Sequence, residues 1–228
     1  MTDLTFTAPK PVLAPTADDR WFPVRRIFCV GRNYADHARE MGYDPDREPP
    51  FFFTKPADAL VISGAATPYP SRTQDFHHEV ELVVAIGIAG SEIPVAGALR
   101  HVWGYAVGID MTRRDLQAEA RESSRPWDMA KGFDASAPIG VLYPASAIGH
   151  PSDGEISLQV NGEARQHADL RELIWNVPEI IAELSTLVRL EPGDLIYTGT
   201  PAGVGAVIRG DRITASIAGL GSLETAIV

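Results

Sequence analysis

The distribution of apolar and polar residues along the chain is mainly that of short β-strands. Some stretches alternate, so that every second side chain lies on one face, and others are short apolar runs typical of buried strands. Within residues 155–168, two alternating runs are joined by Asn161–Gly162, a pair typical of the type I′ turn in a β-hairpin. The strand patterns occupy residues 25–31, 76–87, 102–110, 155–168, 193–205 (where a strand enters a glycine-rich loop) and 211–228.

Three short segments have the composition of helices instead. Residues 33–42 begin with Asn33, a residue type favoured at helix N-caps, and end at Gly42. A helix of only about two turns depends on tertiary contacts for its stability. The two other predicted helices span residues 111–123 and residues 176–188, the latter capped by Asn176.

These elements predict an α+β, mostly β fold rather than a series of βαβ units, because the strands are many and the helices few. Residues 1–24, rich in proline, threonine and aspartate, predict an N-terminal arm or an edge strand. Residues 25–228 are then a single domain, since the sequence shows no repeat and no linker. A lid segment is expected around residues 33–50, where the short helix runs into a charged loop with three prolines.

Two carboxylates interrupt the apolar pattern of residues 76–87. Glu79 and Glu81 lie two residues apart, so a strand places them side by side on one face of a stretch apolar enough to be buried. Like charges in such surroundings are unfavourable unless a positive charge lies between them. Asp110, at the end of a neighbouring apolar strand, supplies a third carboxylate.

A divalent metal ion is one candidate for that positive charge. Three carboxylates suit Mg²⁺, Mn²⁺ or Ca²⁺, which prefer oxygen ligands. Zinc is less well matched, because His77 and His78 point to opposite faces of the strand and no cysteine joins them. The alternative is that each glutamate pairs with an arginine or faces solvent. The third carboxylate favours the metal site.

Two further groups of residues have the chemistry of an active site. His37 and Glu40 are three residues apart on a predicted helix, so the carboxylate can orient the imidazole and raise its basicity for activating a water. The same pattern also fits an exposed helix. Lys55 and Lys131 lie in apolar surroundings, where a lysine needs an anionic partner or a role.

The glycine-rich loop of residues 198–205 offers hydroxyl groups and unencumbered backbone N–H groups that can hold a carboxylate. A plain turn has the same composition. The spacing of its glycines does not match the dinucleotide-binding motif GxGxxG, and a strand rather than a helix is expected to follow it. A dinucleotide site is therefore not predicted.

Composition and charge narrow the possible partners. The chain has 228 residues, of which 45% are hydrophobic and 22% charged, as in ordinary globular proteins. Its net charge of −10 argues against nucleic acid and an anionic membrane surface as partners. A small anionic substrate is compatible with this charge, since a bound cation reverses the local field. The single cysteine, Cys29, the absence of a signal-peptide pattern and the lack of an apolar run of about 20 residues predict a soluble, cytoplasmic protein.

Several stretches, taken together and in order, resemble the fumarylacetoacetate hydrolase family. They are GRNYADHAREMG, PPFFFTKPADALV, HHEVELVVAIG, GYAVGIDMTRRDLQ, RPWDMAKGFD, LIYTGTPAGVGAV and GDRITASIAGLGSLETAI. These stretches span roughly residues 25 to 226. Within the family, the likeness is greatest to its short bacterial fumarylpyruvate-hydrolysing members, which the stretch DPDREPPFFF also resembles.

The resemblance implies a mixed β-roll core with short peripheral helices, a homodimer, and Mg²⁺ or Mn²⁺ as cofactor. It also makes residues 25–228 a catalytic domain. His37 and Glu40 become the pair that activates water, and Lys131 becomes the cation beside the reacting carbonyl. The implied site residues are the metal ligands Glu79, Glu81 and Asp110, the catalytic residues His37, Glu40 and Lys131, and the substrate contacts Arg32, Lys55, Gln117 and Thr200.

The reaction implied by the resemblance is metal-dependent hydrolysis of a carbon–carbon bond in an acylpyruvate, with fumarylpyruvate giving fumarate and pyruvate. The second carboxylate of fumarylpyruvate requires a cation, for which Arg47 and Arg125 are the candidates. One alternative keeps the site but changes the reaction to decarboxylation or tautomerisation of oxaloacetate, or to hydrolysis of acylpyruvates in general. A second alternative is a non-catalytic protein that binds dicarboxylates.

Overall fold

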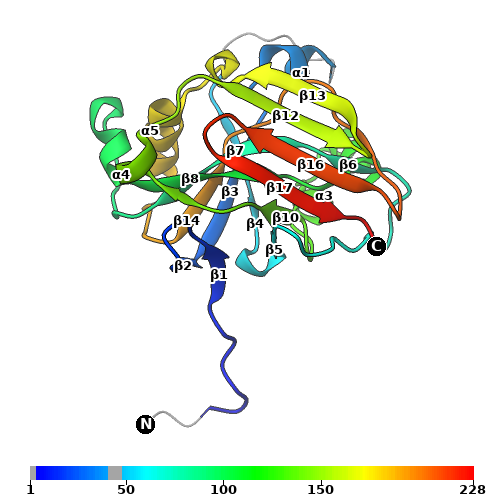
Figure 1. Ribbon diagram of the computed structural model, residues 1–228, viewed down its shortest axis with the longest axis horizontal. Coiled ribbons are helices and arrows are strands. Elements are labelled where there is room, and N and C mark those ends of the chain that lie inside the picture. The colour runs from blue at the N-terminus through cyan, green and yellow to red at the C-terminus, as the bar shows by residue number, and fades with distance from the viewer. Residues whose placement is uncertain (1–3, 41–47) are drawn as a thin grey trace.

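The computed structural model describes residues 4–40 and 48–228, and two layers of β-sheet form its body (Figure 1). Within these residues the larger sheet has eight strands in the order β4-β3-β14-β7-β8-β10-β5, with β11 paired to β8. The sheet is mixed, because β3–β14 and β5–β10 are parallel pairs and the others are antiparallel. Its strands are β3 (Arg26–Gly31), β4 (Phe51–Lys55), β5 (Leu60–Ile62), β7 (Val80–Ile86), β8 (Val102–Ile109), β10 (Ala137–Ile139), β11 (Tyr143–Pro144) and β14 (Asp194–Tyr197).

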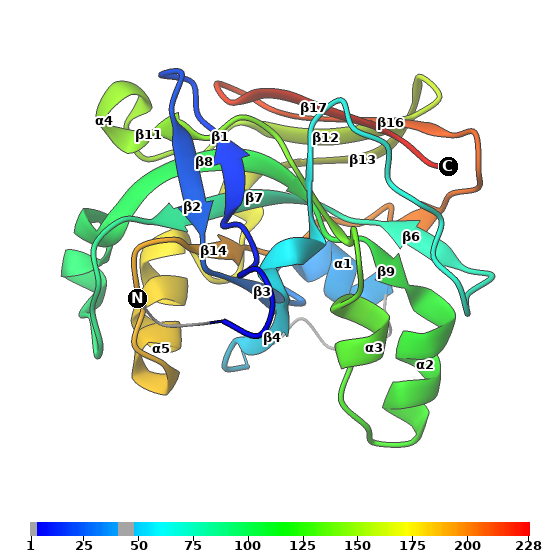
Figure 2. The ribbon, with the colours of Figure 1, turned by 90° about the horizontal axis from the view of Figure 1, so that it is seen from below.

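A four-stranded antiparallel sheet, in the order β13-β12-β16-β17, lies across one face of the larger sheet (Figure 2). A three-stranded sheet, β15-β6-β9, and the hairpin β1–β2 complete the strands of the described residues. The strands of these sheets are β12 (Glu155–Val160), β13 (Glu163–Asp169), β16 (Arg212–Ile217), β17 (Gly221–Ala226), β6 (Phe76–His78), β9 (Thr112–Arg113), β15 (Gly205–Ala206), β1 (Val12–Pro15) and β2 (Trp21–Val24).

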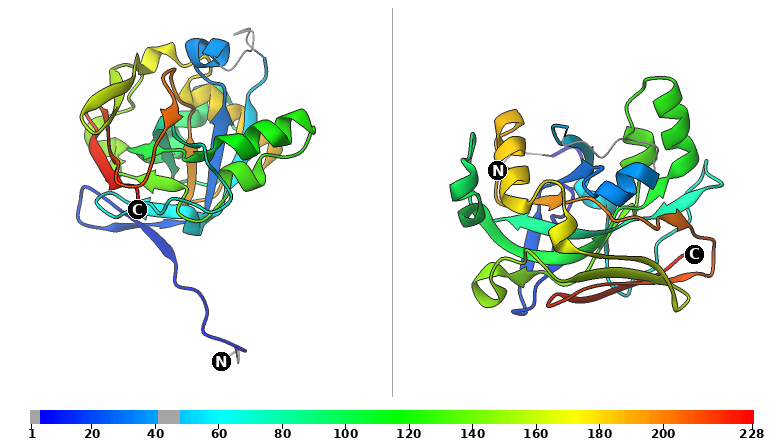
Figure 3. Two further views of the ribbon diagram at one scale, coloured as in Figure 1. Left: turned by 90° about the vertical axis from the view of Figure 1, so that its right-hand side faces the viewer. Right: turned by 90° about the horizontal axis from the view of Figure 1, so that it is seen from above.

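The helices are short and lie at the periphery of the sheets (Figure 3). The α-helices are α1 (Ala35–Glu40), α2 (Arg114–Glu122), α3 (Asp128–Lys131), α4 (Ala145–Ile148) and α5 (Val177–Leu187), and the 3₁₀ helices are η1 (Ala57–Ala59), η2 (Val95–His101) and η3 (Leu170–Glu172). The predicted α+β, mostly β fold with short peripheral helices is confirmed. Among the described helices, none is both long enough and apolar enough to cross a membrane.

Strand β7 runs through the middle of the larger sheet and is buried on both faces. Leu82 and Val84 pack into the core shared with the four-stranded sheet, whereas Val83 and Ala85 belong to a second core on the opposite side. A strand buried on both faces has a nearly continuous apolar sequence, as this one does. Glu81 lies on the same side of the strand as Val83, because side chains alternate along it.

The stretch predicted as one strand, residues 76–87, is divided between two sheets at Glu79. Strand β6 pairs with β9 and β15, whereas β7 pairs with β8 and β14. The facing strands part at the same level, where the N–H of Asp110 donates to the carbonyl oxygen of Glu79 at 2.8 Å. Two of the predicted metal-ligating carboxylates therefore lie where paired strands separate. The alternation of the sequence does not reveal this break.

Two local sequence signals are confirmed. Asn161 and Gly162 have φ angles of 54° and 82°, and they join β12 to β13 as the I′-type sequence predicted. Asn176 caps α5, since its Oδ1 accepts from the N–H of Glu179 at 3.1 Å and Glu179 Oε2 accepts from the N–H of Asn176 at 3.0 Å.

The helix predicted over residues 111–123 begins only at Arg114, which corrects the expected start. The residues before it, 112–113, pair first with β6 as strand β9. Helices α3 and α4 were not predicted from the sequence. Each spans four residues, too few for a periodic apolar pattern to appear.

Asn33 does not cap α1 with its side chain, which corrects the predicted N-cap. Its Nδ2 donates to the carbonyl oxygens of Trp175 at 2.9 Å and Thr198 at 2.8 Å, and its Oδ1 accepts from the N–H of Trp175 at 2.7 Å. Asn33 therefore ties the start of α1 to two distant parts of the chain. The rest of the predicted lid helix and part of its loop, residues 41–47, lie outside the described residues.

The N-terminal arm contributes a short antiparallel hairpin, in which Val12 pairs with Val24. Phe22 and Val24 are buried in the second core, beside the larger sheet. The division of the chain at residue 24, and the assignment of one domain beyond it, stay predictions.

Gly108 allows β7, β8 and β14 to approach one another beside Glu81. It pairs with Glu81, and a Cβ atom added to it would lie 2.4 Å from Val83 Cγ2 and 2.6 Å from Tyr197 Cε1. We expect Gly108→Ala to lower the free energy of unfolding by about 1–3 kcal/mol through overpacking, as measured by urea denaturation. Gly140→Ala is the control, because its added Cβ would meet no atom closer than 3.4 Å. Equal losses in the two variants would contradict the explanation.

Candidate active site

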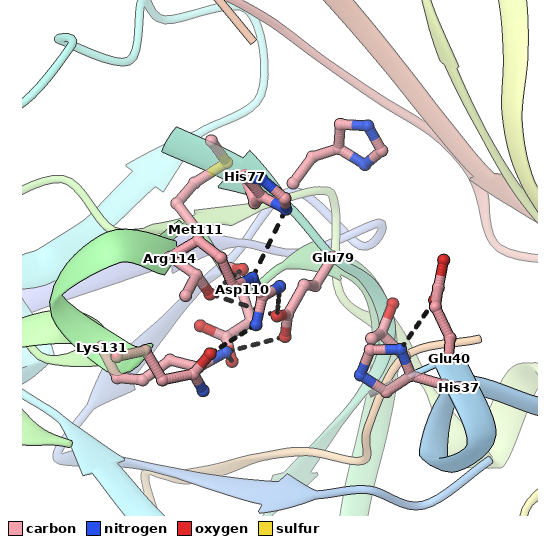
Figure 4. A network of polar contacts seen from close by, with 12 residues as sticks. His37, Glu40, His77, Glu79, Asp110, Met111, Arg114 and Lys131 are labelled. Carbon is pink, nitrogen blue, oxygen red and sulfur yellow. Dashed lines mark hydrogen bonds and ion pairs between the residues drawn. The ribbon is translucent and has the colours of Figure 1, made fainter. Parts of the chain in front are cut away.

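Three buried carboxylates meet where β6 and β7 separate. Glu79, Glu81 and Asp110 each provide an oxygen atom, and these atoms all lie within 4.8 Å of one another. The exposed fractions of the three residues are 4%, 1% and 0%. We call these three residues the carboxylate cluster. Figure 4 shows Glu79 and Asp110 directed toward the same point, with Lys131 beside them.

Two buried lysines neutralise part of this charge. Lys131 Nζ, at the end of α3, lies 2.7 Å from Glu79 Oε2 and 2.7 Å from Asp110 Oδ2. Lys55 Nζ, at the end of β4, lies 2.8 Å from Asp110 Oδ1 but directs its hydrogen bonds to the carbonyl oxygens of Met111 (3.1 Å) and Lys131. Asp110 Oδ1 therefore has an ion-pair contact without a hydrogen bond, and it is one of the few such buried oxygens in the described residues.

Arg114 supplies a third cation from the first turn of α2. Its Nη2 lies 2.5 Å from Glu79 Oε1, and its Nη1 donates to Gln117 Oε1 at 2.5 Å. The two residues are three apart on the helix, so both face the carboxylate cluster. Thr112 Oγ1 also donates to Glu79 Oε1, at 3.3 Å. Glu79 is thus surrounded by donors.

Glu81 has a different environment from Glu79. Its Oε2 accepts a hydrogen bond from the N–H of Gly199 at 2.7 Å, and it makes no ion pair with the described residues. Burial and the neighbouring Asp110 and Glu79 charges hold the pKa of Glu81 well above its usual range. Burial acts in the same direction on Glu79, but Lys131 and Arg114 outweigh it and hold the pKa of Glu79 below its usual range.

The chemistry of the carboxylate cluster fits a hard divalent cation. Its donors are oxygen atoms, as Mg²⁺ and Mn²⁺ require. One feature of the structure leaves room for additional positive charge: the raised pKa of Glu81, whose carboxylate makes no ion pair with the described residues. A divalent cation beside Glu81 would stabilise its ionised form.

His37 and Glu40 form a second group on α1, which we call the dyad. His37 Nδ1 lies 3.2 Å from Glu40 Oε2, and the side chains face each other in Figure 4. Burial lowers the pKa of His37 below its usual value, although Glu79 and Glu40 act in the opposite direction. The imidazole is therefore neutral near pH 7 and able to accept a proton.

The loop after β14 holds the carboxylate of the dyad in place. The N–H of Gly203 lies 3.2 Å from Glu40 Oε2 and 3.3 Å from Oε1. Gly203 has a φ of 94°, and a Cβ atom there would lie 2.0 Å from the carbonyl oxygen of Arg165. Only glycine fits this position without displacing the backbone. The predicted glycine-rich loop thus contacts the dyad through its main chain.

A single cavity connects the two groups. His37, Glu79 and Glu81 all line it, and apolar rings of Phe53 and Trp127 form part of its wall. The complete lining consists of Val30, Gly31, Arg32, His37, Phe53, Glu79, Glu81, Arg114, Gln117, Ala118, Arg121, Trp127, Lys131 and Thr200. A pocket with a few converging polar groups and perturbed pKa values is typical of an active site.

Comparison with known proteins identifies the family. Residues 26–228 match the sequence profile described as fumarylacetoacetate (FAA) hydrolase C-terminal. The crystal structure of fumarylpyruvate hydrolase from Pseudomonas aeruginosa, in complex with Mn²⁺ and pyruvate, is 57% identical, covers 99% of each chain and has a TM-score of 0.97. The chain belongs to the fumarylacetoacetate hydrolase family. The predicted family, its fold and the predicted class of enzyme, a hydrolase of carbon–carbon bonds, are thereby confirmed.

Two curated relatives in the family carry different names. A fumarylpyruvate hydrolase from a Ralstonia species is 46% identical and covers 82% of this chain and 98% of its own. The human mitochondrial oxaloacetate tautomerase FAHD1 is 43% identical and covers 89% of this chain and 91% of its own. The predicted hydrolysis of fumarylpyruvate and the alternative reaction on oxaloacetate therefore each correspond to the name of a relative at similar identity.

The structure brings most of the predicted site residues together. Arg32, Gln117, Lys131 and Thr200 line the cavity, and Glu40 lies behind His37. Lys55, predicted as a substrate contact, does not line the cavity and is instead bound to Asp110. Arg125 is exposed and also does not line it, and Arg47 lies outside the described residues.

Three residues at the site were not predicted from the sequence: Arg114, Arg121 and Gln166. The first two share a face of α2 with Gln117, as their spacing of three, four and seven residues indicates once the helix is located. Gln166 lies on the predicted hairpin, whose alternation shows that it faces inward but not what it contacts.

The raised pKa of Glu81 predicts an unusual pH dependence of stability in metal-free protein. Its carboxyl holds its proton to higher pH in the folded state than in the unfolded state, where the ordinary value is 4.5. The unfolded state therefore loses this proton first, and the folded state loses stability as pH rises above that value. In EDTA, we expect the free energy of unfolding of Glu81→Gln, relative to wild type, to increase from about pH 5 to about pH 8.

The matched control is Glu163→Gln, which removes an exposed carboxylate from β13. Its denaturation curves should follow those of the wild-type protein across the same pH range. Parallel pH profiles for Glu81→Gln and the wild type would show that the Glu81 carboxyl is not perturbed by its burial.

Proposed function

We propose that this protein is a divalent-metal-dependent hydrolase of acylpyruvates that converts fumarylpyruvate and water to fumarate and pyruvate. The observation that carries the proposal is that the neutral, buried His37 and the glutamates of the carboxylate cluster line one cavity. The Pseudomonas relative solved with Mn²⁺ and pyruvate supports it, since pyruvate is a product of this reaction. The name of the Ralstonia relative supports the same substrate.

The carboxylate cluster would hold the cofactor, Mg²⁺ or Mn²⁺, through its oxygen atoms. When bound, the metal supplies a Lewis acid for the 2-oxo acid end of the substrate, where negative charge develops as the bond breaks. Lys55 and Arg114 form ion pairs with Asp110 and Glu79 and hold these two carboxylates in place for this role. We thus assign Lys55 to holding a metal ligand in place rather than to binding the substrate.

The dyad would activate the attacking water. Because Nδ1 of His37 is directed at Glu40, Nε2 is the nitrogen that accepts the proton. The resulting hydroxide attacks the acyl carbonyl carbon, and the carbon–carbon bond to the pyruvate methylene group breaks. The electron pair of that bond passes to the pyruvate enolate, which takes up a proton to give pyruvate. The imidazolium of His37 is the source of that proton.

The other polar residues of the cavity would bind and orient the substrate. We assign Lys131, whose pKa the Asp110 and Glu79 charges raise against the opposing effect of burial, to the oxygen of the attacked carbonyl. We assign the carboxylate at the 2-oxo acid end of the substrate to Arg32, Gln117 and Thr200, which line the same cavity as Lys131.

Tautomerisation of oxaloacetate is the second candidate, because relatives of that name are 42% to 43% identical to this chain. It uses the same 2-oxo acid end of the substrate and needs proton transfers but no attacking water. The attacking water is therefore what separates the two reactions, because a histidine–glutamate pair can also serve proton transfer.

The requirement for the dyad can be measured directly. With Mn²⁺, we expect the wild type to hydrolyse fumarylpyruvate, which releases pyruvate, faster than acetylpyruvate, which also releases pyruvate, or fumarylacetoacetate, which releases acetoacetate. His37→Ala should lower kcat by about 10²–10⁴-fold through loss of the general base, with Mn²⁺ binding retained. His167→Ala, at an exposed position of β13, is the control. Full hydrolytic activity of His37→Ala, or turnover of oxaloacetate alone by the wild type, would refute the proposal.

The geometry of α2 supports a proposed contact for the distal carboxylate of fumarylpyruvate. Arg114, Gln117, Ala118 and Arg121 line the cavity from one face of this helix. Four residues, from Gln117 to Arg121, span about 6 Å along a helix, at 1.5 Å per residue. The two carboxyl carbons of extended fumarylpyruvate are about 7 Å apart, because six carbon–carbon bonds join them. Arg121 is thus at a suitable distance beyond Gln117, and we assign it to the distal carboxylate.

Arg121→Met should lower kcat/KM for fumarylpyruvate by about 10- to 1000-fold, the scale of a charge-assisted hydrogen bond. Acetylpyruvate, which lacks the second carboxylate, should be turned over at the wild-type rate. Arg125→Met is the matched control, since Arg125 is exposed and does not line the cavity. A selective loss in Arg125→Met would transfer the assignment to Arg125, and equal losses on both substrates would make Arg121 a structural residue.

A further inference from the structure

The buried side chain of Gln166 connects β7 to the loop that follows β14. It lies on β13, in the four-stranded sheet, and is 1% exposed. Its Oε1 accepts hydrogen bonds from the N–H of Val80 at 3.0 Å and from His78 Nδ1 at 3.0 Å. Its Nε2 donates to Thr200 Oγ1 at 2.8 Å and to the carbonyl oxygen of Pro201 at 2.8 Å.

Main-chain groups determine which way this amide is oriented. The N–H of Val80 can only donate, so the atom beside it must be the amide oxygen of Gln166. The carbonyl of Pro201 can only accept, so the atom beside it must be the amide nitrogen. The remaining N–H of that nitrogen is directed at Thr200 Oγ1. The opposite orientation would place like groups against each other at both ends.

The orientation of the amide determines the role of the Thr200 hydroxyl. A hydroxyl has one proton to donate and two lone pairs that accept. Since Gln166 donates to Thr200 Oγ1, the hydroxyl proton is left for a different acceptor. No acceptor for that proton is present in the described parts of the chain, and Thr200 lines the cavity. The hydroxyl is therefore available to donate to a ligand.

We infer that Gln166 is a positioning residue that fixes the Thr200 hydroxyl as a hydrogen-bond donor into the cavity and so selects an ionised carboxylate. A carboxylate only accepts hydrogen bonds, and bonds to an anionic acceptor are stronger than bonds to a neutral one. The inference rests on the proposed function, which assigns Thr200 to the substrate carboxylate. The second end of Gln166 holds Val80, next to Glu79, so one side chain sets both a metal ligand and a substrate contact.

The test is calorimetric binding of pyruvate and of its neutral analogue pyruvamide to Mn²⁺-loaded protein. Thr200→Val keeps the shape of the side chain but removes the donor, so Kd for pyruvate should rise about tenfold or more. Kd for pyruvamide should change much less, and Thr200→Ser should bind pyruvate as the wild type does. Gln166→Met should raise the Kd for pyruvate as much as Thr200→Val does. The Kd of the double variant should be no higher than that of either single variant.

Additive losses in the double variant would show that Gln166 does not act through Thr200, and unchanged pyruvate binding by Thr200→Val would overturn the inference outright. Circular dichroism checks that each variant is folded. If Gln166→Met does not fold, Gln166→Glu replaces it. The second carboxylate oxygen of this variant would accept the Thr200 hydroxyl proton, so the affinity for pyruvate should fall by the same factor. If neither variant folds, the Thr200→Val and Thr200→Ser pair still decides whether the Thr200 hydroxyl donates to the carboxylate, and unchanged binding in Thr200→Val overturns the inference.

Binding of pyruvate requires no turnover, so this test separates the inference from the proposed function. Intact discrimination between pyruvate and pyruvamide, with no hydrolysis of fumarylpyruvate, would refute the proposed reaction and support the inference. Hydrolysis of fumarylpyruvate, with equal effects of Thr200→Val on pyruvate and pyruvamide, would refute the inference alone.

Discussion

The burial of three carboxylates at one point is the constraint on which the rest of this structure depends. An ionised group in a low-dielectric interior destabilises the fold by several kcal/mol unless cations and hydrogen-bond donors compensate for lost solvent. Lys55, Lys131 and Arg114 provide the cations from β4, α3 and α2. Ion pairs to the carboxylate cluster therefore anchor the elements around the cavity, including α3, which at four residues is too short to be stable alone.

Within the described residues, the carboxylates of the cluster are not equally neutralised by cations. This uneven neutralisation is typical of a metal-binding or active site rather than of a structural ion pair. Glu79 is surrounded by cations, whereas Glu81 has a main-chain N–H and a raised pKa. The dyad faces the same cavity from the other side, with a histidine that burial keeps neutral. Relatives named for hydrolysis and for tautomerisation share this family with the chain.

Local signals in the sequence were sufficient for much of the fold. Asn161–Gly162 and Asn176 act within a few residues of themselves, and the structure confirms both. The spacing of Glu79 and Glu81 likewise predicted neighbouring carboxylates. Contacts between distant segments could not be predicted in this way. Asn33 has the composition of an N-cap but bonds to residues more than a hundred positions away, and Gln166 in β13 contacts Thr200 in the loop after β14. The division of the strand at Glu79 is set by its partner strands, which alternation does not reveal.

We expect the carboxylate cluster to bind one divalent cation, and this claim can be tested by equilibrium binding of Mn²⁺ measured by electron paramagnetic resonance. The wild type should bind one Mn²⁺ per chain, and Asp110→Asn should weaken that binding at least about 100-fold, because an anionic ligand is lost. Glu163→Gln, at the surface, should bind as the wild type does. Wild-type protein without saturable Mn²⁺ binding, or Asp110→Asn with unchanged affinity, would contradict the claim.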